Sequence, residues 1–233
     1  MPGFQTKKSR RGAQLPNKVG RDDDSRQGGN ALSPRRQELR DALVEAATRI
    51  IAQSGFQALR ARDLAAAVGC AVGAIYNVFA DLDAVILAVK ATTLDALQAE
   101  ILRQLGPDTS TTSHAARDRL VAMARVYLSF ASNNRRLWFS AFEHSSPDTS
   151  SLDAYMLRLD AIFSNIEGPL ALLAPKIQGQ RRPLLARALF SAVHGVVALG
   201  LDMKLGVISP EALIWQVETI LGAALSGLTT GRR

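Results

Sequence analysis

The chain has 233 residues, 47% of them hydrophobic, which is enough to bury the core of one large domain or of a small domain joined to a larger one. A single cysteine, Cys70, excludes an internal disulfide and a cysteine-rich zinc site, and it suits a reducing compartment. The net charge of +7 is uneven, because residues 1–40 hold ten Lys/Arg and four Asp/Glu, a net of +6.

Residues 1–33 are predicted to form a flexible basic arm. They are poor in large apolar side chains and so cannot offset the entropy of ordering. A solvated tail and an arm that binds a polyanion are both open interpretations. No apolar stretch of a secretory signal follows the basic residues, and no run reaches the roughly 18 consecutive apolar residues that a membrane span requires. We therefore expect a soluble, cytoplasmic protein with no membrane partner.

The segment 34–82 is predicted to contain three helices. The dipeptide Ser33-Pro34 is typical of a helix start, with a capping residue before a proline at the first helical position. Gly55 ends the first helix, and Gly69 separates a short second helix from a third. The three predicted helices cover residues 34–54, 62–68 and 72–79.

The third predicted helix has two chemically different sides. At 100° per residue, one arc of about 120° is pure hydrocarbon, whereas the opposite side carries Tyr76 and Asn77 among small residues. Such a helix can pack on its own chain with one side and contact a partner with the other; a merely solvated polar side is the alternative. The apolar arc consists of Val72, Ile75, Val78 and Phe79.

A short helix, a glycine turn and a helix with a polar side form the helix-turn-helix pattern. The second helix of this pattern enters the major groove of double-stranded DNA. Asn77 can form two hydrogen bonds with adenine, while Gly73 and Ala74 allow close approach and Ala74 can meet a thymine methyl. The Tyr76 hydroxyl suits a phosphate contact. We expect these four residues to face the bases.

The remaining residues, 83–231, are predicted to form a larger antiparallel helical domain. Asp81 or Asp83 caps a long helix, turn residues at 106–113 form a loop, and a bend is expected at Gly168-Pro169. With the first three, these helices give an all-α fold of about nine helices. The further predicted helices cover about 83–105, 114–132, 137–142, 152–173, 182–205 and 210–228.

Residues 55–85, GFQALRARDLAAAVGCAVGAIYNVFADLDAV, resemble the N-terminal domain of TetR/AcrR-type transcriptional regulators. The resemblance covers about 36–85 and implies a regulator that binds DNA. The chain departs from the usual phosphate-contacting residues at Arg60, Ala71 and Leu82, and nearby arginines, Arg40 among them, can supply the charge. The predicted DNA-binding set is Arg35, Arg36, Arg60, Arg62, Ala71, Gly73, Ala74, Tyr76 and Asn77.

Two later segments, 127–144 and 188–201, are similar to the ligand-binding domain of the WHG-type TetR subgroup. Trp138 and the pair His194-Gly195 match that pattern, whereas Phe190 replaces a frequent tryptophan. The resemblance implies an effector pocket for an unknown, apolar small molecule. A neutral core histidine is the alternative for His194, and the three histidines cannot assemble a metal site. The expected pocket residues are Trp138, Phe142 and His194.

The last two predicted helices are apolar over wider arcs than one chain covers easily. Small residues between the large ones permit close helix approach, so a homodimer through a four-helix bundle is expected, as the resemblance also implies. The expected dimer interface is Leu189, Val193, Val196, Val217, Ile220, Leu221 and Ala224.

These observations predict a homodimeric repressor that binds a palindromic operator and is released by a small-molecule effector. An enzyme is the rival class, but the sequence has no P-loop, no G-x-S-x-G and no H-E-x-x-H, so we expect no catalytic residue and no cofactor. A helical interaction protein whose arm touches anionic membrane is a third class, and it leaves the two-sided helix unexplained.

Overall fold

The computed structural model describes residues 33–143, 152–203 and 206–230, and every regular element within them is a helix. The predicted all-α class is confirmed, while most of the predicted basic arm, residues 1–32, lies outside the described residues. The elements are α1 (Pro34–Ser54), the short 3-10 helix η1 (Phe56–Ala58), α2 (Ala61–Val68), α3 (Val72–Ile75), α4 (Leu82–Leu105), α5 (Ser113–Asn133), α6 (Arg135–Glu143), α7 (Leu152–Leu173), α8 (Arg181–Leu201) and α9 (Pro210–Thr230).

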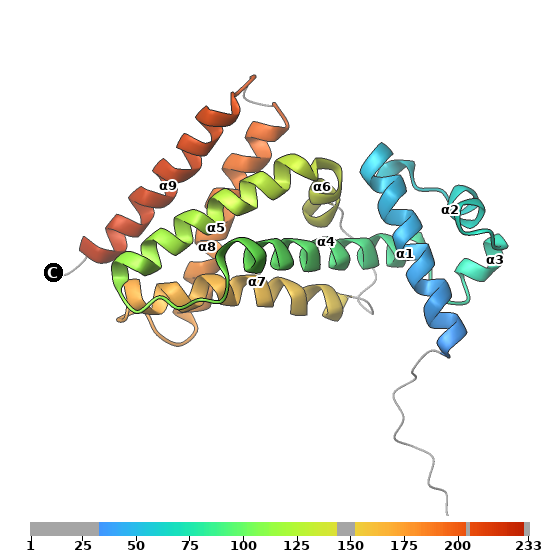
Figure 1. The fold of residues 1–233 in the computed structure, drawn as a ribbon, viewed down its shortest axis with the longest axis horizontal. Coiled ribbons are helices and arrows are strands. Elements are labelled where there is room, and N and C mark those ends of the chain that lie inside the picture. The colour runs from blue at the N-terminus through green and yellow to red at the C-terminus, as the bar shows by residue number, and fades with distance from the viewer. Residues whose placement is uncertain (1–32, 144–151, 204–205, 231–233) are drawn as a thin grey trace, which may run out of the picture.

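Helices α1–α3 pack together at one end of the molecule, and we call them the head (Figure 1). Their apolar faces form one buried cluster with the first turns of α4. The left-handed backbone of Gly69 (φ 75°, ψ 34°) ends α2 and turns the chain into α3. The central side chains of this cluster are Leu43, Ile51, Leu64, Ile75 and Val85.

Helix α4 leads from the head into the larger group of helices α5–α9, which we call the body (Figure 1). Asp81 is its N-cap, since its carboxylate accepts a hydrogen bond of 2.7 Å from the Ala84 amide, and this decides between the two predicted caps. Val89 belongs to the core of the head, whereas Leu94 and Leu97 belong to the core of the body. One rigid element therefore contributes to both cores.

Helix α6 also touches both parts. Leu137 packs against the head cluster, and the next residue, Trp138, is buried in the body. The Arg136 guanidinium donates to the carbonyl oxygens of Ala52 (3.3 Å) and Gln53, which belong to the open C-terminal end of α1. The head is thus attached to the body through α4 and through α6.

Three local details differ from the sequence-based expectation. Helix α3 is shorter than predicted, because regular α-helix ends at Ile75, although the Phe79 amide still bonds to the Ile75 carbonyl at 2.9 Å. Val72 lies in the predicted apolar arc but is 38% exposed, since it sits in the first turn beyond the reach of the core. Helix α8 ends at Leu201, where Met203 adopts a left-handed backbone (φ 54°).

Candidate nucleic-acid interface and apolar pocket

The segment from Val72 to Phe79 has a buried side and an exposed side. Ile75 and Phe79 are at most 5% exposed and pack into the head, whereas Tyr76 is 50% exposed and Asn77 is exposed. Among the described residues, the Asn77 side-chain amide makes no hydrogen bond, so all of its donors and acceptors are open to a partner.

The small residues predicted to face DNA lie on this same exposed side. Ala71 and Gly73 are exposed and Ala74 is half-buried. A Cβ added at Gly73 would meet nothing within 4 Å, so the space above the helix is free. The molecular surface therefore recedes at Gly73 and projects at Tyr76 and Asn77. This shape would let the helix backbone lie close to the floor of a groove.

The four predicted arginines differ in their local contacts. Arg35 and Arg62 are exposed and form no ion pair among the described residues. Arg60 is also exposed, but its guanidinium folds back and donates to the carbonyl oxygens of Gln57 (2.6 Å) and Leu59 (3.0 Å). Arg36 donates to the Asn77 carbonyl at 2.6 Å. Two of the four are thus already engaged by their own chain.

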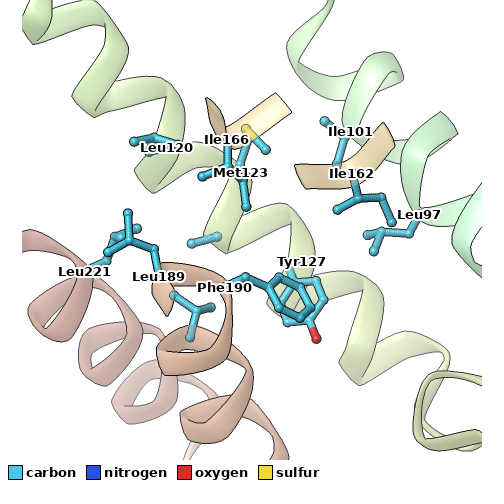
Figure 2. A pocket seen from close by; sticks show the side chains of 12 residues that line it. Leu97, Ile101, Leu120, Met123, Tyr127, Ile162, Ile166, Leu189, Phe190 and Leu221 are labelled. Atoms are coloured by element: carbon cyan, nitrogen blue, oxygen red, sulfur yellow. The ribbon is translucent and has the colours of Figure 1, made fainter. Parts of the chain in front are cut away.

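A pocket of about 60 Å³ lies inside the body, among helices α4, α5, α7, α8 and α9 (Figure 2). No charged side chain lines it, and Tyr127 is the one lining residue with a hydroxyl group, which points away from the aliphatic side chains in Figure 2. The lining residues are Leu97, Ile101, Leu120, Met123, Ala124, Tyr127, Ile162, Ile166, Leu189, Phe190, Val193 and Leu221.

The three residues predicted to form an effector pocket do not line this one. The rings of Trp138, Phe142 and His194 lie behind Tyr127 and Phe190, with the His194 ring 5.0 Å from the Trp138 ring and 5.6 Å from the Phe190 ring, centroid to centroid. They form a second layer of the pocket wall. The aliphatic residues that line the pocket gave no distinguishing signal in the sequence, because leucine and isoleucine line most helical cores.

This second layer contains a polar pair formed by a buried tyrosine and a half-buried histidine. The Tyr127 hydroxyl and His194 Nδ1 lie 2.7 Å apart and form a hydrogen bond. Burial raises the pKa of Tyr127 well above its ordinary value, which the neighbouring Trp138 indole counteracts only partly, and burial lowers the pKa of His194. Both groups are therefore neutral at pH 7. Elsewhere in the described ranges, no three His, Cys, Asp or Glu side chains gather as a metal site.

Comparison of the sequence with models of known protein families gives two matches. The family of bacterial regulatory proteins named tetR matches residues 43–89, which cover most of the head and the start of α4. The tetracyclin repressor-like C-terminal domain matches residues 120–219, and together the two matches cover more than half of the chain. The chain belongs to the TetR family.

Solved structures share the fold of this TetR-family chain at low sequence identity. A protein of unknown function from Rhodococcus sp. RHA1 is 20% identical with a TM-score of 0.62, over 90% of this chain and 100% of that one. A TetR-family protein from Vibrio parahaemolyticus is 23% identical with a TM-score of 0.55, over 79% and 97%. The regulator FadR from Bacillus subtilis, solved with stearoyl-CoA, is 15% identical with a TM-score of 0.53, over 83% and 99%. No curated protein matches the sequence.

The TetR-family body places the predicted dimer residues in two environments. Leu189, Val193, Val217 and Leu221 are at most 7% exposed, because they fill the core of the body within one chain. They have almost no surface left for a second chain, which corrects their assignment to a dimer face. Val196 is half-buried, while Ile220 (45%) and Ala224 are exposed.

The exposed face of α8 and α9 carries the predicted residues Ile220 and Ala224 together with residues that the prediction left out of the interface or used only as spacers. It combines large apolar side chains with small ones at helical spacing, so this surface is apolar and another helix can approach it closely. By length and composition alone both helices could cross a membrane, although neither is an unbroken apolar run, and only 28% and 22% of the most apolar window is buried within the chain. The face consists of Leu184, Ala188, Ser191, Ala192, Leu199, Trp215, Thr219, Ile220, Ala223 and Ala224.

Proposed function

We propose that this TetR-family regulator is a cytoplasmic, homodimeric repressor. Residues 34–82 bind a near-palindromic operator, and residues 83–231 form the dimer and take up a small, apolar effector that releases the DNA. The observation that carries the DNA-binding part is the two-sided segment 72–79, with Tyr76 and Asn77 bare on the side opposite its buried face.

Base recognition depends on the free amide of Asn77. An asparagine that forms two hydrogen bonds with adenine contributes roughly 1–3 kcal/mol of discrimination against a wrong base. Gly73 lets the helix approach the groove floor, and Arg35 and Arg62 are free to contact phosphates, which fixes the position of the head without reading sequence.

Dimerisation follows from the exposed apolar face of α8 and α9. Two such faces can form a four-helix bundle about a two-fold axis, which would cover Trp215 and Ile220 and explain why both helices are so apolar. The two copies of α3 must then lie about 34–36 Å apart, or farther by whole DNA turns, to enter grooves on one side of the duplex.

The size and chemistry of the pocket favour a small, uncharged effector. Its lining carries no charge, so a charged ligand would lose hydration without a partner. A volume of about 60 Å³ is smaller than the 150 Å³ or so that suffices for benzene, so a ligand must push helices apart on entering. The Bacillus subtilis FadR was solved with stearoyl-CoA, and an acyl chain of that length would require a much wider opening here.

Helix α4 is suited to transmit that movement. Leu97 and Ile101 line the pocket, while Val85 and Val89 on the same helix are part of the head core. A displacement of α4 by the ligand would change the orientation of the head and hence the spacing of the paired recognition helices. A coupling of about 1–3 kcal/mol would change operator affinity by 5- to 150-fold.

Selection of bound sequences from random duplex DNA tests this function. We expect an enriched motif with two-fold symmetry. The variant Asn77→Ala should then lose at least tenfold in affinity for the selected duplex and keep its salt-sensitive affinity for a scrambled duplex. Failure to enrich any sequence would contradict the proposed function, and an equal loss on both duplexes would contradict the role of Asn77.

A further inference from the structure

The recognition segment has too few residues to hold its own shape. Regular α-helix covers only Val72–Ile75, and a helix of this length is not stable by itself in water. The turn that continues it is closed by the Val78 and Phe79 amides, which both bond to the Ile75 carbonyl. The Asn77 carbonyl lies two residues past the end of α3 and accepts no backbone amide among the described residues, and it lies beside the side chain that we assign to base recognition.

Two arginines of α1 contact this unsupported end. Arg36 donates from its guanidinium to the Asn77 carbonyl at 2.6 Å. Arg40, one turn later on the same side of α1, places its guanidinium carbon 4.5 Å from the centre of the Phe79 ring. The Arg36 contact joins residues 41 positions apart, and both contacts connect the start of α1 to the segment that follows α3.

The charge and position of Arg36 suit this contact. A guanidinium is an ionised donor, and a hydrogen bond from an ionised donor to a carbonyl oxygen is stronger than one between neutral groups. Arg35, the neighbouring residue, is also exposed and carries the same charge, but it has no hydrogen-bond or ion-pair partner in the described ranges. Within one turn of α1, one arginine supports the recognition segment and the other is free.

We propose that Arg36 is a positioning residue for base recognition: it holds the backbone at Asn77 and thereby aims the side chains of Tyr76 and Asn77 into the groove. This inference rests on the proposed DNA-binding function. A simple phosphate contact strengthens binding to every sequence, whereas a positioning residue strengthens binding to the selected sequence above all.

The pair Arg35→Ala and Arg36→Ala separates the two roles in the full-length protein. Dissociation constants are measured for the selected duplex and for a scrambled duplex of equal length, at several salt concentrations. Arg35→Ala should weaken both complexes by a similar factor and reduce the salt slope by about 0.9 for each lost phosphate contact, hence by about 1.8 for a dimer that carries two copies of the residue. Arg36→Ala should lower the ratio of selected to scrambled affinity at least tenfold. If both variants leave that ratio unchanged, Arg36 is only a phosphate contact and the proposal is wrong.

Hydrogen exchange tests the same proposal without DNA. The amides of Val78 and Phe79 bond to the Ile75 carbonyl at 3.1 and 2.9 Å, so their exchange reports on the closed form of this segment. Exchange at both amides should become at least fivefold faster in Arg36→Ala and stay unchanged in Arg35→Ala. Unchanged exchange in Arg36→Ala overturns the positioning role whatever the DNA results are. Faster exchange without any selected sequence would contradict the DNA-binding function and leave the positioning contact established.

Discussion

Gly73 is the one glycine in the exposed part of the recognition segment, and the space beyond it is empty in the free protein. Gly73→Ala should therefore fold without a clash and raise the free energy of unfolding by up to about 0.5–1 kcal/mol, because alanine loses less entropy in a helix. The added methyl would hold the helix away from the groove floor, so affinity for the selected duplex should fall at least tenfold. Denaturant unfolding and a binding titration measure the two effects.

A matched control for Gly73 is Ala66→Ser, an exposed position on the neighbouring helix α2. It also changes one small surface residue of the head, but we assign it no base contact, and we expect little change in affinity. A Gly73→Ala protein that binds the selected duplex as tightly as the parent would show that α3 does not lie close to the bases.

The half-buried His194 gives the protein a predictable response to acid. The pKa of His194 is lowered by burial, so the unfolded chain takes up a proton at this residue before the folded chain does. The free energy of unfolding should then decrease as the pH falls below the ordinary histidine value of 6.5, with a slope of at most about 1.4 kcal/mol per pH unit from this group.

Variants at two histidines isolate this contribution. His194→Asn places an amide near the position of Nδ1 and does not titrate, so it should remove the slope between pH 7 and 5. His114→Asn is the control, because His114 is exposed and pairs with Asp118 on the same helix. Equal slopes in the parent and in His194→Asn, measured by denaturant unfolding, would show that another group governs the acid response.

At the scale of helices, the sequence predicted most boundaries because local signals determine them. Gly55, Gly69 and Gly106 have positive φ angles at helix ends, and Asp81 caps α4 through its own side chain. Such signals act within a few residues and do not depend on the tertiary fold. The end of α3 was placed too late, since its apolar period continues to Phe79 after the regular helix has become a turn.

Which apolar face meets which neighbour could not be predicted in the same way. Helices α8 and α9 are apolar on nearly all sides, so their periodicity did not show that Leu189 and Val217 face the body and that Ile220 faces outward. The same holds for the pocket, where the conspicuous aromatic residues lie one layer behind the leucines and isoleucines that line it. Only packing between residues far apart in the sequence determines which of these side chains face the body, the solvent or the pocket.

The bridging role of α6 leads to a prediction at this scale. Leu137→Ala should remove the contact of α6 with the head core and reduce the free energy of unfolding by about 1–2 kcal/mol, less than for a fully buried leucine. Because the head would then be held mainly by α4, the head and the body should unfold in separate steps. Differential scanning calorimetry measures both effects.

Leu102→Ala is the control for this experiment, since Leu102 lies on α4 and is 45% exposed. It should cost well below 1 kcal/mol and leave the shape of the transition unchanged. A single sharp transition in Leu137→Ala, with the stability of the parent, would show that α6 does not hold the head.

For the whole molecule, the exposed face of α8 and α9 predicts the oligomeric state. A charge at the centre of an apolar interface loses its hydration without gaining a partner, so the double variant Trp215→Glu and Ile220→Glu should convert the dimer to monomers. Multi-angle light scattering measures the mass directly. Since both side chains are exposed in one chain, the monomer should remain folded.

Leu157→Glu serves as the matched control, because Leu157 is 72% exposed on α7, away from that face. Its dimer should be unaffected. A double variant that remains dimeric would place the interface elsewhere on the molecule, and a monomeric parent protein would contradict the homodimer altogether.

The chain has two tryptophans, and they lie in opposite surroundings. Trp138 is 1% exposed in the wall behind the pocket, whereas Trp215 is 66% exposed on the expected contact face. Indole emission shifts to shorter wavelength in an apolar environment, so the two residues should give distinct spectral signals. With Trp215→Phe, the fluorescence would report on the interior alone, and with Trp138→Phe it would report on association. The natural chain therefore contains an optical probe for each of these events, without any added dye.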